Sequence, residues 1–338
     1  MLALLPLLAA APSTEAQPVA ENDQGKSAQA SGQGHRKVAL LVGISKYSAS
    51  GGWSNLNTES DLERIRAALE IQGFAPGNIH TLTDGDADRK GIEAAFRRHL
   101  IEGVGTAAVA FFHYSGHGQR ITDDDHDEID GYDEALVPFD APQRLIEGYD
   151  GGKHLRDDDL HDWLQQLRRK IGPDGDVVIS LDSCFSGAAT RGLTARGSLD
   201  SLGPPQAPLE GKLGADRAGG FVEGNVHDVA ATAPASGDGK LAPFVAISSA
   251  RHDELAFETR DEQGRAIGSL SFALGSALRN ASAETTYKDL SAPPKLCPTI
   301  INRERSAVAL RRSRSASSRP KTPSTSPSPI RWAVALRL

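Results

Sequence analysis

The sequence predicts an α/β domain in which a mostly parallel β-sheet is flanked by helices. Apolar runs at 107–112 and 177–181 are typical of strands that are covered on both faces, as the strands of parallel sheets are. Segments with apolar residues at helical spacing lie between such runs. A chain of 338 residues, 39% hydrophobic and 24% charged, is long enough for one large α/β domain or two small ones.

Strand and helix patterns alternate along the chain. The apolar runs that predict strands lie at 37–45, 79–82, 107–112, 177–181 and 243–250. The segments with a helical apolar stripe lie at 58–69, 88–100, 157–167 and 268–280. Thr58 to Asp61 resembles a capping box at the start of the first helix. The aspartates at 157–159 suit a helix N-terminus, because the helix dipole favours negative charge there.

Cys184 follows the apolar run at 177–181, and Ser186 and Gly187 end that run abruptly. Open α/β sheets place their reactive groups at the C-terminal ends of strands, so one interpretation of Cys184 is a nucleophile. The other is a small buried side chain, because unpaired cysteines are among the most buried residues. A disulfide with Cys297, the second cysteine of the chain, would disable the nucleophile.

The apolar run at 107–112 leads to His117, which has a glycine on each side. A thiol is only slightly ionised at neutral pH, so a nucleophilic cysteine needs an imidazole that takes its proton. We therefore expect Cys184 and His117 to meet in the fold, with the amides of Gly118 and Cys184 as donors to an oxyanion. His113 is the rival base, but it lies inside the expected strand and is expected to pack.

The motifs HYSGHG and DSCFSG, at 113–118 and 182–187, resemble those of the caspase-like cysteine peptidases, and within peptidase family C14 those of bacterial metacaspases. The resemblance covers roughly residues 37–280. It implies a caspase-like fold with three α/β/α layers, and hydrolysis of peptide bonds by a dyad of Cys184 and His117. Caspases carry Gln two residues before the cysteine, where this chain has an aspartate.

That aspartate, Asp182, points to the same side of a strand as Cys184, because residues two apart share a face. A carboxylate beside the nucleophile favours a cationic substrate side chain. The resemblance implies an acidic pocket for Arg or Lys, formed here by Asp182, Asp61 and Ser115. Other interpretations are Asp61 as the capping-box acid and Asp182 as a helix-terminus or salt-bridge partner. Trp53 is expected to be a packing residue.

The segment 123–134 carries eight carboxylates. Such a run is either a solvated loop or a site for a hard cation bound through oxygen ligands. The resemblance implies calcium ligands at Asp133, Asp157 and Asp158, but the position of a further family aspartate holds Arg191. A cation there repels a bound ion, so calcium dependence is left open. The hydrolysis itself requires no cofactor.

The ends of the chain differ in composition from its centre. Residues 1–16 resemble a secretory signal without a basic start, which indicates an exported protein, periplasmic or secreted; without export it would be cytoplasmic. A flexible linker is expected at 17–36, the peptidase domain at 37–280 and a basic, low-complexity tail at 281–338. A Gly-, Pro- and Ala-rich connection at about 190–240 interrupts the domain.

The net charge of −7 is unevenly distributed. The segment 302–338 holds nine Lys or Arg and one Glu, which leaves about −15 on the rest of the chain. An acidic body argues against nucleic acid as a partner and suits cationic substrates. The apolar leader is too short for a stable membrane span. Protein or peptide substrates with Arg or Lys at the cleavage site are the expected partners, and the oligomeric state is not predicted.

These features predict a cysteine endopeptidase, a hydrolase that cleaves after Arg or Lys. The alternative is a catalytically silent caspase-like module that binds partners or calcium, although the intact histidine and cysteine motifs count against it. Self-cleavage is expected in the connection after the nucleophile, because exposed segments of small residues extend readily into a cleft. The candidate residues there are Arg191, Arg196, Lys212, Arg217 and Lys240.

Overall fold

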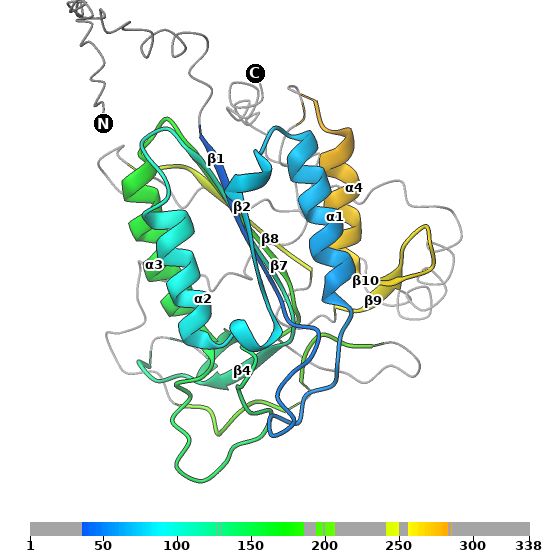
Figure 1. Cartoon of the computed structure of the whole chain (residues 1–338). Helices are drawn as coiled ribbons and strands as arrows, with labels where there is room; N and C mark the ends of the chain where they lie inside the picture. The colour runs from blue at the N-terminus through cyan, green and yellow to red at the C-terminus, as the bar shows by residue number, and fades with distance from the viewer. Residues whose placement is uncertain are drawn as a thin grey trace, which may run out of the picture. The chain divides into compact units, whose positions relative to one another are not determined.

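A five-stranded parallel sheet lies at the centre of the protein, in the order β2-β1-β3-β7-β8 (Figure 1). Its strands are β1 Lys37–Gly43, β2 Ile79–Thr83, β3 Val109–Ser115, β7 Asp176–Asp182 and β8 Phe244–Ser248. Every residue of β3 and β7 is buried, as their apolar runs predict. Because these strands are parallel neighbours, their C-terminal ends lie side by side, with Ser115 paired to Asp182.

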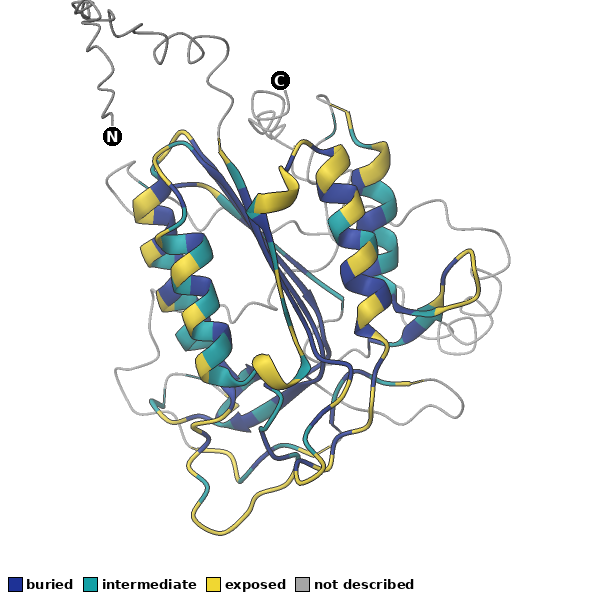
Figure 2. Ribbon diagram, viewed as in Figure 1, coloured by how far each residue is buried: buried dark blue, intermediate teal, exposed yellow. Residues whose placement is uncertain are grey.

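Helices cover both faces of this sheet. They are α1 Thr58–Ile71, α2 Arg89–Ala95, α3 Asp157–Ile171 and α4 Ser269–Asn280, and α2 continues into a π-helical turn, η3 Phe96–Ile101. Helices α1 and α4 lie on one face and α2 and α3 on the other (Figure 1), with their buried sides toward the sheet (Figure 2). The core divides in the same way, with Ile65 and Leu274 in one apolar cluster and Phe96 and Trp163 in another. The predicted three-layer α/β/α architecture is confirmed.

Smaller strands extend the fold beyond the sequence prediction. An antiparallel sheet consists of β4 Gly118–Thr122, β5 Tyr132–Leu136 and β6 Leu155–Arg156, and β9 Glu258–Arg260 pairs with β10 Ala266–Gly268. Two 3₁₀ turns, η1 Pro76–Asn78 and η2 Asp84–Asp86, flank β2. The interpretation of 123–134 as a solvated loop is wrong for its last residues, because β5 begins at Tyr132 and buries Asp133 against β4.

The capping-box interpretation of Thr58 to Asp61 is also wrong. Asn57 precedes the first turn of α1, and no side chain caps it. The carboxylate of Asp61 instead accepts a hydrogen bond from the backbone N–H of Gly268, 2.7 Å away at the start of α4. Asp61 is therefore turned toward the interior between α1 and α4.

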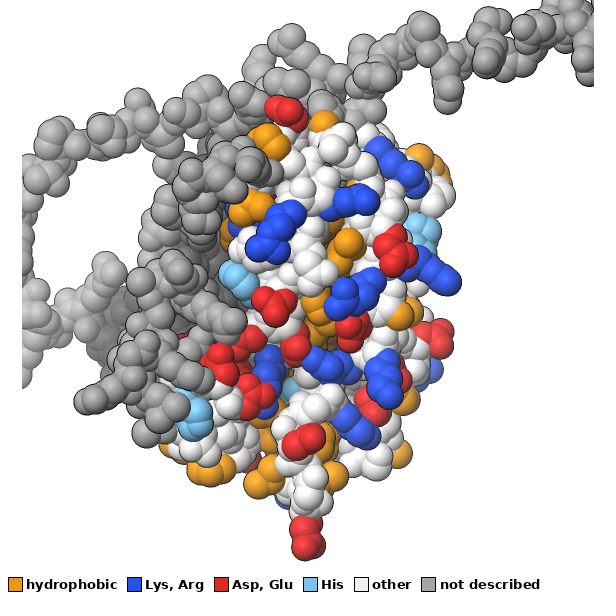
Figure 3. Space-filling view, turned by 90° about the vertical axis from the view of Figure 1, so that its left-hand side faces the viewer, with side chains coloured by type: hydrophobic (Ala, Val, Ile, Leu, Met, Phe, Trp, Pro, Cys, Tyr) orange, Lys and Arg blue, Asp and Glu red, His pale blue; other side chains and the backbone are white. Residues whose placement is uncertain are grey.

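The computed structural model describes residues 36–126, 128, 130–185, 194–198, 200–206, 241–249, 256–282 and 285. Outside the described residues lie the expected leader, nearly all of the linker and the tail, and Cys297. Four of the five predicted cleavage residues also lie outside them: Arg191, Lys212, Arg217 and Lys240. Within the described residues, no helix has the length and apolar character that a membrane span requires. On the side of the molecule where α2 and α3 lie, acidic and basic side chains are interspersed (Figure 3).

Candidate active site

The ends of β3 and β7 converge on one backbone oxygen, the carbonyl of Arg196. The N–H groups of Gly118 and Cys184 each donate to this oxygen at 3.0 Å. Gly118 follows His117 directly, so the shared acceptor brings the two predicted strand ends together. Two N–H groups aimed at one carbonyl oxygen have the arrangement of an oxyanion hole.

The peptide bond after Arg196 lies against the candidate nucleophile. Cys184 is fully buried and forms no disulfide. A Cβ placed on Gly197 would lie 2.2 Å from the carbonyl oxygen and 3.1 Å from the Cβ of Cys184. Only a residue without a side chain fits this approach, which keeps the Arg196–Gly197 bond close to the cysteine.

His117 has the tautomer that a base requires. Its Nε2 lies 2.9 Å from the carbonyl oxygen of Ser54, which can only accept, so Nε2 carries the proton. Burial lowers the pKa of His117 to about 4, so the ring is neutral at pH 7 and Nδ1 keeps its lone pair. Among the described residues, Nδ1 has no hydrogen-bond partner. It is therefore free to accept a proton.

Aromatic side chains fix the orientation of this imidazole. The ring of Trp53 stacks on it with centroids 4.7 Å apart, and the indole N–H donates to the Ala141 carbonyl at 3.0 Å. The hydroxyl of Tyr47 accepts from the backbone N–H of His117 at 2.7 Å. Trp53 thus packs, as predicted, but it packs against the candidate base. No sequence motif indicates Tyr47 or Ser54, which lie in the loop after β1.

The side chain of Arg196 fills the predicted acidic pocket. It is fully buried, with Nη2 2.7 Å from the Asp61 carboxylate and Nη1 2.7 Å from the Ser115 hydroxyl oxygen. Asp182 lies 3.7 Å from Nη1. The structure therefore brings the three predicted pocket residues together around one guanidinium. Burial alone would lower the pKa of Arg196, but Asp61, Asp182 and Glu258 together raise it above its ordinary value.

Glu258 is a third carboxylate of the pocket that the sequence analysis missed. One of its oxygens lies 3.4 Å from Nη2 of Arg196. The same side chain accepts from the backbone and side-chain nitrogens of Asn57, at 2.7 and 2.9 Å, which fixes its position beside α1. No motif surrounds Glu258, and its role depends on contacts with residues about 200 positions earlier in the chain.

Asp182 is held by the N-terminus of α4. Its Oδ2 accepts from the backbone N–H and the hydroxyl of Ser271 at 2.7 and 2.6 Å, whereas Oδ1 is buried without a hydrogen-bond partner among the described residues. Burial raises the pKa of Asp182, and Arg196 opposes this. The helix-terminus and pocket interpretations thus apply to the same carboxylate. His113 lies beneath it, 3.3 Å from the Ser271 hydroxyl, and packs as predicted.

The connection after the nucleophile was expected to be exposed, and this is wrong for Arg196. The Arg196 N–H donates to the Ala256 carbonyl, and the Glu258 N–H donates to the Thr194 carbonyl, both at 3.1 Å. Residues 194–196 thus pair antiparallel with residues 256–258, which lead into β9. Ion pairing in the pocket outweighs the tendency of this small-residue segment to remain solvated.

Comparison with known proteins identifies the family. A model of the caspase domain, peptidase family C14, matches residues 36–292. The chain belongs to the caspase-domain family. The resemblance found in the two motifs and the caspase-like fold are confirmed, whereas the bacterial subgroup stays a prediction.

Similar proteins in this family include metacaspases. Metacaspase-1 of Pyricularia oryzae is 31% identical over 280 residues, 75% of this chain and 66% of its own length. Metacaspase-1 of Yarrowia lipolytica is 28% identical over 272 residues, 74% and 56% of the two chains. The chain thus spans about half to two thirds of the length of these relatives. A solved structure from Geobacter sulfurreducens shares the fold, with a TM-score of 0.50 and 21% identity over 78% of this chain and 90% of that one.

A candidate metal centre lies apart from the pocket of this caspase-domain protein. Asp133, Asp157 and Asp158 each offer a carboxylate oxygen within 4.8 Å of the others. Burial raises the pKa of Asp133 to about 8 despite an ion pair with Arg156, and burial and neighbouring carboxylates raise the pKa of Asp157 well above its ordinary value. Oδ1 of Asp133 is buried without a partner among the described residues. A donor set of three carboxylates, one of which keeps a buried oxygen without a partner among the described residues, fits a hard divalent cation.

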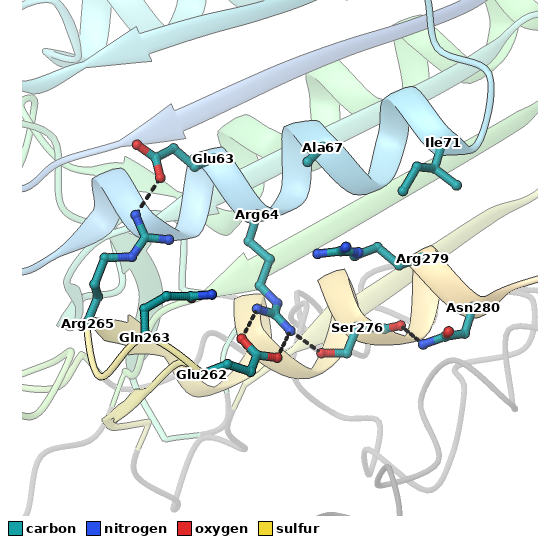
Figure 4. A pocket seen from close by; sticks show the side chains of 10 residues that line it. All are labelled: Glu63, Arg64, Ala67, Ile71, Glu262, Gln263, Arg265, Ser276, Arg279 and Asn280. Atoms are coloured by element: carbon teal, nitrogen blue, oxygen red, sulfur yellow. Dashed lines mark hydrogen bonds and ion pairs between the residues drawn. The ribbon is translucent and has the colours of Figure 1, made fainter.

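A wide hollow between α1, α4 and the β9–β10 turn contains charged residues but no predicted site residue (Figure 4). Its volume is about 830 Å³. Two arginines that line it are paired, Arg64 with Glu262 at 2.8 Å and Arg265 with Glu63 at 2.7 Å. These ion pairs connect α1 to the β9–β10 turn.

Proposed function

We propose that the protein is a cysteine endopeptidase that cleaves after Arg or Lys and processes itself after Arg196. The position of Arg196 carries the proposal. Its guanidinium lies in a pocket of three carboxylates, and its carbonyl oxygen accepts from the Gly118 and Cys184 amides. A residue bound at both ends in this way has the pose of a substrate residue before the scissile bond.

The proposed reaction uses groups that surround this bond. The Cys184 thiol gives its proton to Nδ1 of His117, and the thiolate attacks the Arg196 carbonyl carbon. The oxygen becomes negative and is held by the two amide donors. The C–N bond then breaks as the proton passes from His117 to the Gly197 nitrogen, which leaves as an amine. Water hydrolyses the thioester on Cys184, which releases the Arg196 carboxylate and restores the thiol.

The charge of the pocket supports Arg or Lys selectivity. Asp61, Asp182 and Glu258 attract a guanidinium or ammonium, and an aspartate substrate side chain would be repelled by all three. The Ser115 hydroxyl donates to Asp61 at 2.5 Å and accepts from Arg196, so it links the carboxylate to the guanidinium. A silent binding module would need neither the oriented tautomer of His117 nor paired amide donors. The peptidase is therefore the better proposal.

Calcium binding at Asp133, Asp157 and Asp158 is part of this proposal. The three carboxylates would hold the ion, which would supply positive charge that relieves their mutual repulsion. Calcium takes no part in breaking the peptide bond. Asp133 belongs to β5, which pairs with β4, and β4 begins at the oxyanion donor Gly118. Ordering of β5 by the ion would thereby support the site.

The test compares peptides that end in Arg, Lys or Asp before a fluorogenic group, with Cys184→Ala as the inactive control. Cleavage of the Arg and Lys peptides, and not of the Asp peptide, is expected. The protein is also incubated with calcium and with chelator, and new N-termini are sequenced. A new terminus at Gly197 in the wild type and not in Cys184→Ala is expected. Preference for Asp, or identical fragments from both proteins, would overturn the proposal.

A further inference from the structure

The segment that follows the bond after Arg196 lies along β4. This segment, residues 197–198 and 200–206, is called the strap. It runs parallel to β4, with bridges from Gly118 to Gly197 and from Ile121 to Leu202. The Thr122 N–H donates to the Leu202 carbonyl at 3.0 Å, and the Leu202 N–H donates to the Arg120 carbonyl at 2.7 Å. The strap therefore pairs with the edge of the small sheet at two points.

Leu202 anchors the strap through an apolar pocket. Its side chain is 2% exposed and packs with Ile121 and Ala135, with the half-buried Tyr149 against them. Among the described strap residues, Leu202 is the one whose side chain joins an apolar cluster. A hollow of about 340 Å³ adjoins it, lined in part by the exposed Leu145.

The other contacts to the strap engage its backbone. The Gln119 side-chain amide donates to the Asp200 carbonyl at 2.9 Å, and the Thr122 hydroxyl donates to the Pro204 carbonyl at 2.8 Å. The Gln206 N–H donates to the Gly131 carbonyl at 3.1 Å. Backbone contacts accept almost any sequence, whereas an apolar pocket selects one side chain. Selectivity along the strap thus lies at the position of Leu202.

We propose that β4 and the pocket of Ile121, Ala135 and Tyr149 form a docking site for the part of a protein substrate beyond the scissile bond. The site takes an extended segment with an aliphatic side chain six residues after the scissile arginine, as Leu202 follows Arg196. This inference rests on the proposed endopeptidase function. It follows from the position of β4, which starts at the oxyanion donor Gly118 and continues along the leaving side of the bond.

The kinetic test uses the Leu202→Asp protein, whose own strap no longer fills the pocket, with Ile71→Asp as a control for a new charge at an exposed apolar residue of α1. Two peptides copy residues 194–206, one with leucine and one with aspartate at the position of Leu202. With the Leu202→Asp protein as the enzyme, the KM of the leucine peptide is expected to be at least tenfold lower than that of the aspartate peptide. The two kcat values should be similar, because a buried leucine contributes equally to substrate and transition-state binding. Equal KM values would overturn the docking site.

A short peptide that ends in Arg before the fluorogenic group separates this result from the proposed function. If the short peptide is cleaved but the two long peptides have equal KM values, the peptidase proposal is supported and the docking site is wrong. Binding of the two long peptides, labelled for fluorescence anisotropy, is measured with Cys184→Ala/Arg196→Gln/Leu202→Asp, whose own segment has lost both anchors. An at least tenfold tighter Kd for the leucine peptide is expected. Tighter binding of the leucine peptide without any cleavage would overturn the peptidase proposal and leave the docking site as a peptide-binding site. Equal Kd values for the two peptides would overturn the docking site.

Discussion

Arg196 and Asp61 form an ion pair of 2.7 Å in which both side chains are fully excluded from solvent. The two residues are 135 positions apart, so the pair ties the segment after the nucleophile to the first turn of α1. Loss of one partner of such a pair leaves the other charge buried and uncompensated. A cation in the pocket therefore stabilises the fold, and an empty pocket lowers the free energy of unfolding.

Arg196→Gln is expected to lower the free energy of unfolding by about 3–5 kcal/mol, because three carboxylates remain in the pocket without their cation. Arg196→Lys should lose much less. Urea titrations in the Cys184→Ala background measure both. In the active protein, cleavage at Gly197 should persist with Lys and disappear with Gln, and a Gln variant cut at this bond would contradict the pocket assignment.

Asp182→Asn and Glu258→Gln should each lower kcat/KM for an Arg peptide by roughly 30-fold to a few thousandfold, the equivalent of about 2–5 kcal/mol for one lost partner of a desolvated charge pair. Glu262→Gln is the matched control, because Glu262 is 57% exposed and pairs with Arg64 outside the pocket. Steady-state kinetics on one Arg peptide measure all three. A Glu258→Gln enzyme as active as Glu262→Gln would exclude Glu258 from substrate binding.

Gly268→Ala should block the pocket sterically. Its new Cβ would lie 2.1 Å from the Asp182 carboxylate and 2.7 Å from Cζ of Arg196. We expect KM for an Arg peptide to rise at least tenfold, because the carboxylate is fixed by α4 and has little room to move. Gly105→Ala is the control, since a Cβ there meets nothing within 4 Å. Equal KM values for the two variants would show that the pocket adapts.

Buried histidines should make the fold acid-sensitive. Burial lowers the pKa of His154 to about 3, so between about pH 6 and 4 the unfolded chain binds a proton there that the folded chain does not. Stability from this residue is thus present at neutral pH and falls with pH. In the Cys184→Ala background, His154→Gln should reduce the slope of unfolding free energy against pH by about 1.4 kcal/mol per unit. An unchanged slope would mean that His154 titrates equally in both states.

Calcium should raise the Tm of Cys184→Ala but not of Cys184→Ala/Asp157→Asn. Burial and nearby carboxylates raise the pKa of Asp157, so its charged form costs stability at neutral pH unless a cation compensates it. Without calcium, Asp157→Asn should therefore melt higher than its parent. Asp162→Asn, on the exposed side of α3, is the control. A calcium response retained by Asp157→Asn would remove Asp157 from the metal site.

The strand ends that form the site could be predicted, because long buried runs and glycine-flanked motifs leave clear patterns. Cys184, His117 and the predicted pocket residues lie on β3, β7 and α1 or directly beyond them, where parallel pairing determines the neighbours of the strand ends. The strands of the small sheet were missed because they are short and because β4 and β5 adjoin or overlap the acidic segment 123–134. Their stability comes from cross-strand pairing and not from their own composition.

Two site residues left no signal in the sequence. Ser54 acts through its carbonyl oxygen, a group that every residue possesses. Glu258 is an ordinary acid until the fold brings it to Asn57 and Arg196. The burial of Arg196 was missed for a related reason. A positive charge among small residues indicates solvent exposure, and the acids that bury this charge come from distant segments of the chain.

The pairing of β7 with β8 determines what self-cleavage would leave behind. β8 follows Arg196 in the chain, yet it pairs in parallel with β7, which precedes it. A cut after Arg196 would therefore convert one chain into two that share a single sheet. Folding of the uncut chain is independent of its concentration, but reassembly of two separated fragments is bimolecular. Dilution after unfolding would then make inactivation irreversible for the cut protein, while the uncut precursor could still refold.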